Sequence, residues 1–306
     1  MWTFLISNSA AYSQNTYMFS QFENAKGLFN PAFTGRSDCI NGIVISRAQW
    51  MGMEGAPVLH GINMHFPVPK HNSTAGFTIV NEKMGMRNYF NTAVSFAMSF
   101  RTGASSHLSF GLQTGILGFH FDKSKAVLTD AGFDPFFEGN NAFYVLPDVS
   151  FGAYYRNAGY FAGLSLPRIL LDDFNFTEKK FTIDRLSFKY QHIYLNTGYL
   201  FPINEFVDIK PALMIKYLPA TPAQYCLLAR MQFEKSLGFG LGWRINESVH
   251  LYTGYHISDN LGIYYSYDLT VNKLSGYNSG SHEFCIKFNF GESAKKPVII
   301  DSIRDF

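Results

Sequence analysis

Residues 224–244, QYCLLARMQFEKSLGFGLGWR, decide the fold class of this chain. Apolar side chains take every second position on both sides of Glu234 and Lys235, and mostly polar or small residues stand between them. The apolar positions are Tyr225, Leu227, Ala229, Met231, Phe233, Leu237, Phe239, Leu241 and Trp243. Successive side chains of a strand point to opposite faces, whereas a helix repeats about every 3.6 residues. The stretch therefore predicts two strands joined by a tight turn, each with one apolar face.

The same period of two runs through most of the chain from residue 39 onward. It is clear in residues 90–100 and 284–290, where aromatic and aliphatic side chains alternate with polar or small ones. The pattern predicts about fourteen strands of roughly 8–12 residues, the length of a tilted strand that crosses a bilayer. The predicted strands are 39–50, 58–66, 73–82, 88–100, 107–118, 146–155, 159–166, 190–201, 207–217, 223–233, 236–244, 249–257, 261–267 and 282–290.

The composition indicates which kind of all-β protein this is. Charged residues make up 16% of the 306 residues, aromatic residues make up 17%, and the mean hydropathy is −0.03. The chain lacks the apolar run of roughly 18 residues that a membrane helix needs. Its net charge of +2 gives no reason to expect nucleic acid as a partner. These properties favour an antiparallel transmembrane β-barrel in a bacterial outer membrane, whose wall meets lipid outside and polar groups inside.

The lengths of the predicted connections agree with this fold. Alternate connections are short: 67–72, 101–106, 156–158, 202–206, 234–235 and 258–260. The three longest connections, about 119–145, 167–189 and 268–281, all fall on the opposite side of the predicted barrel. Outer-membrane barrels have short periplasmic turns and longer outer loops. With an even number of strands in the predicted barrel (39–290), we expect residues 14–38 and the tail 291–306 to be periplasmic.

The first residues resemble part of an export signal. Trp2 to Ile6 is apolar, and Ala11-Tyr12-Ser13 resembles a cleavage site before Gln14, although no basic residue precedes Lys26. We predict a partial signal peptide over residues 1–13; the alternative is an ordinary N-terminal extension. In the tail, a polar stretch (292–297) is followed by an apolar one (298–300). This order predicts docking on a periplasmic partner or, alternatively, packing at the barrel rim or disorder.

Four short motifs occur in order along the chain. They are Asn30-Pro31-Ala32-Phe33-Thr34-Gly35, Arg47-Ala48-Gln49-Trp50-Met51-Gly52, Gly55-Ala56-Pro57 and Ser281-His282-Glu283. In this order they resemble the PorP/SprF family of type IX secretion system membrane proteins. The resemblance implies an outer-membrane barrel that is associated with type IX secretion and, in some members, with gliding motility. It also implies two kinds of partner, namely an exported or cell-surface protein and periplasmic components of the secretion machine.

The motif positions are the candidate site residues: Asn30, Pro31, Gly35, Arg47, Gln49, Trp50, Gly52, Gly55, Pro57, His282 and Glu283. Asn30-Pro31 predicts a turn. Gly52 and Gly55, together with Pro57, predict a tight hairpin loop. Trp50 suits the aromatic girdle at the membrane interface, while Arg47 and Gln49 are expected to face the lumen. Two interpretations stay open: these residues start the barrel correctly, or they bind a partner.

The residue types that commonly act in catalysis or metal binding do not form a recognisable catalytic, cofactor or metal site in this sequence. His120 and Asp122 lack further ligands nearby in the sequence, and Asp172-Asp173 lacks calcium-site spacing. We expect His192, His250 and His256 to be hydrated lumen residues, and Cys39, Cys226 and Cys285 to be small apolar or lumen-facing ones. The expectation is therefore a protein that is not an enzyme and has no cofactor.

Aromatic residues gather in two of the predicted outer loops. They are Phe133, Phe136, Phe137, Phe143 and Tyr144 in one loop, and Phe174 and Phe176 in the other. Large rigid side chains make good contacts for a protein partner, although they are also able to cover or plug the barrel mouth. We therefore predict a barrel that binds an exported protein and links it to periplasmic secretion components. The alternative is a passive pore for small solutes.

Overall fold

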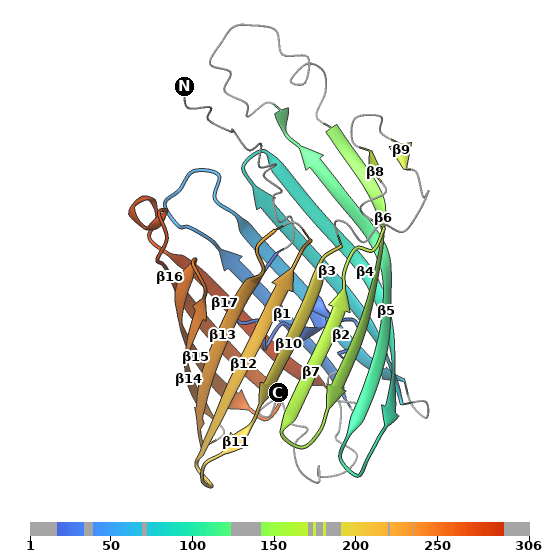
Figure 1. Ribbon diagram of the computed structural model, residues 1–306, viewed down its shortest axis with the longest axis vertical. Coiled ribbons are helices and arrows are strands. Elements are labelled where there is room, and N and C mark those ends of the chain that lie inside the picture. Colours follow the sequence, from blue (N-terminus) through green and yellow to red (C-terminus); the bar gives the residue numbers. More distant parts are fainter. Residues whose placement is uncertain are drawn as a thin grey trace, which may run out of the picture.

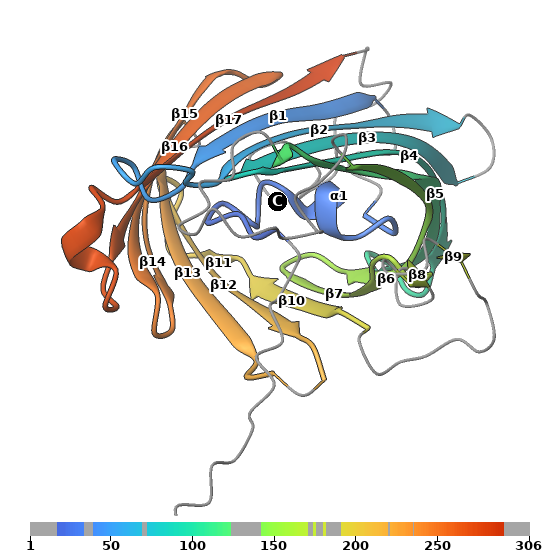
Figure 2. The same cartoon turned by 90° about the horizontal axis from the view of Figure 1, so that it is seen from above.

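The computed structural model describes residues 17–33, 39–68, 72–123, 142–170, 174–175, 180–181, 191–219, 221–234 and 236–290. Within these ranges, fourteen antiparallel strands form a closed barrel (Figures 1 and 2). The barrel strands are β1 (Ile40–Ala48), β2 (Val58–Val68), β3 (Ser73–Met84), β4 (Arg87–Arg101), β5 (His107–Phe121), β6 (Ala142–Arg156), β7 (Tyr160–Leu166), β10 (Ile193–Tyr199), β12 (Val207–Tyr217), β13 (Gln224–Phe233), β14 (Leu237–Arg244), β15 (Ser248–Ser258), β16 (Leu261–Thr270) and β17 (Ser281–Phe290).

The remaining elements are short. β11 (Phe201–Pro202) pairs with β12, and β8 (Phe174–Asn175) pairs with β9 (Lys180–Phe181) outside the barrel sheet. Within the described ranges, the helical elements with stated bounds are α1 (Lys26–Phe29) and a 3-10 turn at Ser275–Tyr277. In the described part of the chain, no helix is long and apolar enough to cross a membrane.

Two strand pairings close the ring. β1 pairs with the last strand, β17, in a register that joins Ile40 to Phe290 and Ala48 to His282. β10 pairs with β12 and completes the other half of the sheet. Closure gives every barrel strand a hydrogen-bonded neighbour on both sides over part of its length, which limits the exposed backbone groups at sheet edges.

The predicted strands and connections are confirmed, with small shifts at the ends. The strand predicted at 207–217 has the observed bounds, and most others differ by one to three residues at an end. The largest shift moves the start of β6 to Ala142. Since β5 also extends to Phe121, the first long loop is 122–141 instead of 119–145. The longest connections, 122–141, 167–192 and 271–280, share one end of the barrel, called here the long-loop end. The other is the short-turn end.

The two faces of the wall differ as the period of two predicts. On β14, Leu241 is 62% exposed and Phe239 is 48% exposed, because their side chains point away from the barrel axis. Glycines 238, 240 and 242 stand between these residues and face inward. The outer face is therefore a continuous apolar surface suited to lipid.

One segment departs from the expected topology. Residues 17–33, called here the lumen segment, lie inside the barrel (Figure 2), although residues 14–38 were predicted to lie in the periplasm. That prediction is wrong for the described residues because the segment is rich in large apolar side chains that the interior shields from water. Those side chains are Phe19, Phe22, Leu28 and Phe29, and each is at most 6% exposed. The predicted signal peptide (1–13) and tail (291–306) fall outside the described residues.

Candidate functional site: the filled lumen and its mouth

A buried polar network holds the start of the lumen segment against the barrel wall. The Ser20 hydroxyl donates to Asp268 Oδ2 at 2.5 Å, and its backbone N–H donates to Glu283 Oε2 at 2.9 Å. The Gln21 backbone N–H donates to the other Glu283 oxygen at 2.8 Å. These carboxylates belong to β16 and β17, so the segment is bound to strands more than 240 residues away in sequence.

Arg47 joins the same network from β1. Its guanidinium lies 2.7 Å from Asp268 Oδ2 and 3.1 Å from Glu283 Oε2, and it donates to the Ser20 hydroxyl at 2.8 Å. The Arg47 side chain is only 2% exposed. Since Arg47 and Glu283 are register partners across β1 and β17, the pair binds the lumen segment at the seam where the ring closes.

Arg244 extends the network toward the long-loop end. One of its guanidinium nitrogens donates to Ser20 Oγ at 3.1 Å, and another lies 2.7 Å from Glu247 Oε1. Burial alone would raise the pKa of the Glu247 carboxyl, but the Arg244 guanidinium favours the ionised form and holds the pKa below its ordinary value. The network therefore contains two arginines and three carboxylates, and opposite charges adjoin one another throughout it.

A second group of contacts lies deeper in the lumen. Glu23 forms an ion pair with Arg230 of β13, which also donates to Asn24 Oδ1 at 3.1 Å and to the Tyr252 hydroxyl at 3.0 Å. Lys26 is fully buried, lies 4.0 Å from Glu23 and stands 3.6 Å from the centre of the Phe161 ring. Charged groups of the lumen segment are thus paired or placed over aromatic faces.

Asn30 and Pro31 fit a part of the wall that is lined by glycines. Asn30 Nδ2 donates to the carbonyl oxygens of Ala153 and Leu164, at 3.0 and 3.2 Å, and the predicted turn is confirmed by the Phe33 N–H donating to the Asn30 carbonyl oxygen at 3.1 Å. A Cβ added to Gly111 would lie 2.3 Å from the Pro31 carbonyl oxygen. The turn therefore approaches the wall more closely than any side chain on Gly111 would permit.

A cavity of about 270 Å³ opens above the lumen segment at the long-loop end. Gln49, Trp50 and Pro57 from the β1–β2 loop line it together with Tyr17 and Met18. We call this space the mouth cavity. Its lining also includes the charged side chains of Arg47, Glu82, Arg87, Lys216, Arg244 and Glu247.

The sequence comparison decides the family. The chain matches the family described as type IX secretion system membrane protein PorP/SprF over residues 11–288. It belongs to the PorP/SprF family. The resemblance inferred from the four motifs is therefore confirmed, and so is its implication of an outer-membrane barrel associated with type IX secretion. No curated protein matches the chain.

Solved structures resemble this PorP/SprF protein in fold. The Ralstonia pickettii toluene transporter TbuX superposes with a TM-score of 0.52 at 7% sequence identity, covering 87% of this chain and 93% of that one. The Acinetobacter baumannii outer membrane protein Omp33 has a TM-score of 0.46 at 8% identity and covers 83% of this chain and 100% of its own. At such identities the likeness concerns the fold alone.

The PorP/SprF motif positions divide into three places. Asn30, Pro31, Arg47 and Glu283 contact or belong to the lumen segment, whereas Gln49, Trp50 and Pro57 line the mouth cavity. His282 faces the outer wall, where its Nδ1 lies 2.7 Å from the Tyr265 hydroxyl, so it does not join the others. Gly35 falls outside the described residues.

The β1–β2 loop has the predicted glycine-dependent geometry, but it places Trp50 differently. Gly52 and Gly55 have positive φ values of 91° and 71°, in the left-handed region that favours glycine. Trp50, two residues beyond the end of β1, also has a positive φ, of 50°. The expected place of Trp50 in the lipid-facing girdle is therefore wrong, since the residue lines the mouth cavity.

The predicted aromatic contact loops are only partly described. Phe143 and Tyr144 lie on β6 and not in a loop, because that strand starts at Ala142. Phe143 is 57% exposed on the outer wall and stacks on Phe90 with ring centres 6.2 Å apart. Phe174 lies on β8, whereas Phe133, Phe136, Phe137 and Phe176 fall outside the described residues.

The three histidines expected in the lumen are buried there. His250 is 1% exposed and its Nδ1 lies 3.5 Å from Asp268, while His256 Nε2 lies 3.1 Å from the Tyr264 hydroxyl. His192 is 8% exposed, and all three cysteines are buried and form no disulfide with one another. The described residues contain no group of three or more potential metal ligands.

Sequence reasoning missed the partners that hold the lumen segment of this PorP/SprF chain. Arg230 and Arg244 were placed on the polar face of their strands, but no counter-ion was assigned to them. Glu23 and Lys26 received no role. Two features of the sequence could have indicated these partners. Charges that are buried inside a barrel need partners, and an aromatic-rich segment that carries Glu23 precedes the first strand.

Proposed function

We propose that this protein is a plugged outer-membrane scaffold of the type IX secretion system. It binds an exported or cell-surface protein at its long-loop end and secretion components at its periplasmic end. The observation that carries this proposal is that the lumen segment fills a barrel of this family. The proposal includes a role in gliding motility. It assigns no catalytic step to the protein.

The lumen segment favours a scaffold over a passive pore. A fourteen-strand barrel is wide enough to conduct when nothing fills it. Here Phe19, Phe22 and Ala25 are fully buried, and the polar residues around them hydrogen-bond to the wall. A permanently open path for solutes is not expected from a lumen filled in this way.

The mouth cavity supports binding at the long-loop end. It combines the Trp50 ring with charged groups of both signs, among them Arg87 and Glu247. Large aromatic side chains beside polar groups are common contact residues of protein interfaces. Family motif residues therefore line a concave surface that an exported protein is able to reach from outside.

Affinity purification of the tagged protein from outer membranes in mild detergent tests the proposal. We expect the wild type to retain a type IX secretion substrate and periplasmic secretion components. Trp50→Ala should reduce recovery of the substrate about tenfold, whereas Trp243→Ala on the lipid-facing wall should leave it unchanged. Recovery of general porins alone would contradict the proposal.

Planar-bilayer recordings of the pure protein address the passive pore. The scaffold predicts no steady conductance, because the lumen segment blocks the barrel. A constant open current from the wild type would favour the pore.

A further inference from the structure

A groove crosses the outer face of the wall over strands β12 to β16, and it is called here the outer groove. Its volume is about 730 Å³. On β12 its lining includes Ile209, two residues from the start of that strand at the short-turn end. On β16 it includes Tyr267, three residues before the strand ends at the long-loop end. The groove therefore runs obliquely from the short-turn side of the wall to its long-loop side.

Small outward side chains form the floor of the outer groove. Ala229 on β13 is the register partner of Leu241, and Thr253 on β15 is the register partner of Phe239. Leu241 and Phe239 are much larger and stand beside this floor. A channel of this shape accommodates a hydrocarbon chain. Because such a chain is already out of water in a bilayer, van der Waals contact with the groove decides whether it stays there.

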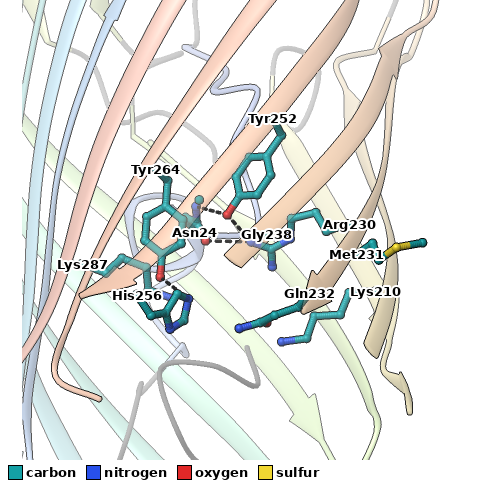
Figure 3. A pocket seen from close by; sticks show the side chains of 11 residues that line it. Asn24, Lys210, Arg230, Met231, Gln232, Gly238, Tyr252, His256, Tyr264 and Lys287 are labelled. Carbon is teal, nitrogen blue, oxygen red and sulfur yellow. Dashed lines mark hydrogen bonds between the residues drawn. The ribbon is translucent and has the colours of Figure 1, made fainter. Parts of the chain in front are cut away.

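The strands under the outer groove are held from the lumen side. Arg230 on β13 donates to Asn24 Oδ1 at 3.1 Å, and Asn24 Nδ2 donates to the Tyr252 hydroxyl of β15 at 3.5 Å (Figure 3). Figure 3 also shows Met231, the next residue on β13, pointing away from this cluster, and Met231 lines the groove. The lumen segment thus supports the floor from behind, and a groove with a fixed shape binds a ligand at a lower entropic cost.

Polar side chains stand at the long-loop end of the outer groove. Tyr265 and Tyr267 line it, and the His282 ring of β17 lies beside both, with ring centres 6.1 and 5.2 Å away. His282 Nδ1 lies 2.7 Å from the Tyr265 hydroxyl, and its Nε2 has no hydrogen-bond partner among the described residues. An aromatic girdle accounts for tyrosines near a strand end, but not for a histidine bonded to one of them on the lipid-facing wall.

The loop that follows these tyrosines carries positive charge and no negative charge. It joins β16 to β17 over residues 271–280 and contains Lys273, but no aspartate or glutamate. Lys273 is exposed. Lysine at the membrane surface attracts the phosphate groups of lipids. A cation next to hydroxyl and imidazole groups therefore suits a head group that carries both phosphate and hydroxyls.

A second groove on the wall provides a contrast within the same molecule. Its volume is about 390 Å³, and its floor includes Ala153 on β6 and Ala162 on β7. Its outward tyrosines, Tyr155 and Tyr160, stand at the ends of these strands that adjoin the short-turn end. Of these two grooves, the outer groove is thus the one with polar groups at the long-loop end.

We propose that the outer groove binds one outer-leaflet glycolipid with a phosphorylated sugar head group, the chemistry of lipid A. Its acyl chains lie along the groove, and its head group contacts Tyr265, Tyr267 and His282, with a phosphate toward Lys273. The ligand belongs to the outer leaflet because the polar end adjoins the long loops, which outer-membrane barrels place outside. The site does not depend on the proposed secretion role.

Native mass spectrometry of the purified full chain tests the site, with lipid A and phosphatidylethanolamine as probes. We expect one lipid A molecule per chain and weaker retention of phosphatidylethanolamine. Thr253→Trp places an indole ring on the groove floor and should weaken lipid A binding about tenfold. Thr114→Trp, on the outer face of β5 and outside the groove, is the matched control and should bind as the wild type does. Circular dichroism checks that both variants keep the strand content of the wild type.

A second variant tests the head-group contacts. Tyr265→Phe together with His282→Leu removes the polar end and leaves the groove floor intact, so the preference for lipid A over phosphatidylethanolamine should disappear. Tyr225→Phe, elsewhere on the outer face, should keep that preference. Equal retention of the two lipids by the wild type would overturn the proposal. So would the retention of neither lipid, or equal effects of the two tryptophan substitutions.

Discussion

At the scale of single residues, the interior of this barrel is organised by a few buried charges. Arg47 is the clearest case, since one guanidinium bonds two carboxylates and a serine of the lumen segment. The Arg-x-Gln-Trp motif therefore has a structural role at its first position. Its third and fourth positions, Gln49 and Trp50, line the mouth cavity together with Arg47, so one short motif contributes both to the plug contacts and to the cavity.

Replacing Arg47 should test how strongly this network stabilises the fold. Arg47→Gln leaves Asp268 and Glu283 without their main counter-ion in a buried site, which should lower the free energy of unfolding by about 3–5 kcal/mol. Urea unfolding in detergent measures the change. Lys83→Gln, at an exposed end of β3, serves as the control, and equal stability of the two variants would contradict the assigned role.

At the scale of elements, glycines decide where the lumen segment approaches the wall. Gly111 on β5 lies against the Pro31 backbone, and Gly152 on β6 lies against the Asn30 side chain. A strand glycine often marks the close approach of another backbone. The period of two predicted β5 and β6. It did not predict that their inward-facing glycines form the surface on which the lumen segment packs.

Filling the space at Gly111 should displace the Asn30-Pro31 turn. Gly111→Ala should reduce the free energy of unfolding by about 1–3 kcal/mol, because backbone atoms of Pro31 and Ala32 occupy the place of the new methyl group. Gly238→Ala is a matched control, since its nearest neighbours would lie 3.8 Å away. Equal unfolding midpoints for both variants would contradict the close fit.

The apolar outer face of β14 permits a test of membrane depth. Leu241→Arg, near the middle of the strand, should cost about 2–4 kcal/mol of stability in a bilayer, because a charge on the lipid face is poorly solvated. Leu237→Arg lies on the same face at the strand's end, and its cost should be about 0–1 kcal/mol. Equal costs in folding titrations with lipid vesicles would contradict the proposed immersion of this face.

At the scale of the whole molecule, the lumen segment converts a wide barrel into a filled one. Its contacts extend from the β16–β17 carboxylates, through Arg230 on β13, to the backbone of β6 and β7. The segment thus bonds to both halves of the ring. Plug and wall should behave as one cooperative structure.

Removing the lumen segment should open the barrel. A chain lacking residues 17–33 is expected to conduct ions in a planar bilayer, because the strands close the ring without the segment. A synthetic peptide of residues 14–38 should reduce the current when added. If the shortened chain folds, as judged by strand content in circular dichroism, and remains silent, the segment is not the principal block.

The sequence by itself determined the strands, their alternating faces and the family of this protein. These depend on local rules, since a period of two and short turn motifs are readable within about ten residues. The interior was decided by tertiary structure alone. Glu283 contacts Arg47 and Ser20 across more than 230 residues of sequence. The lumen segment lies within the ring and not beside it, because the closed barrel offers it both burial of its apolar side chains and counter-ions.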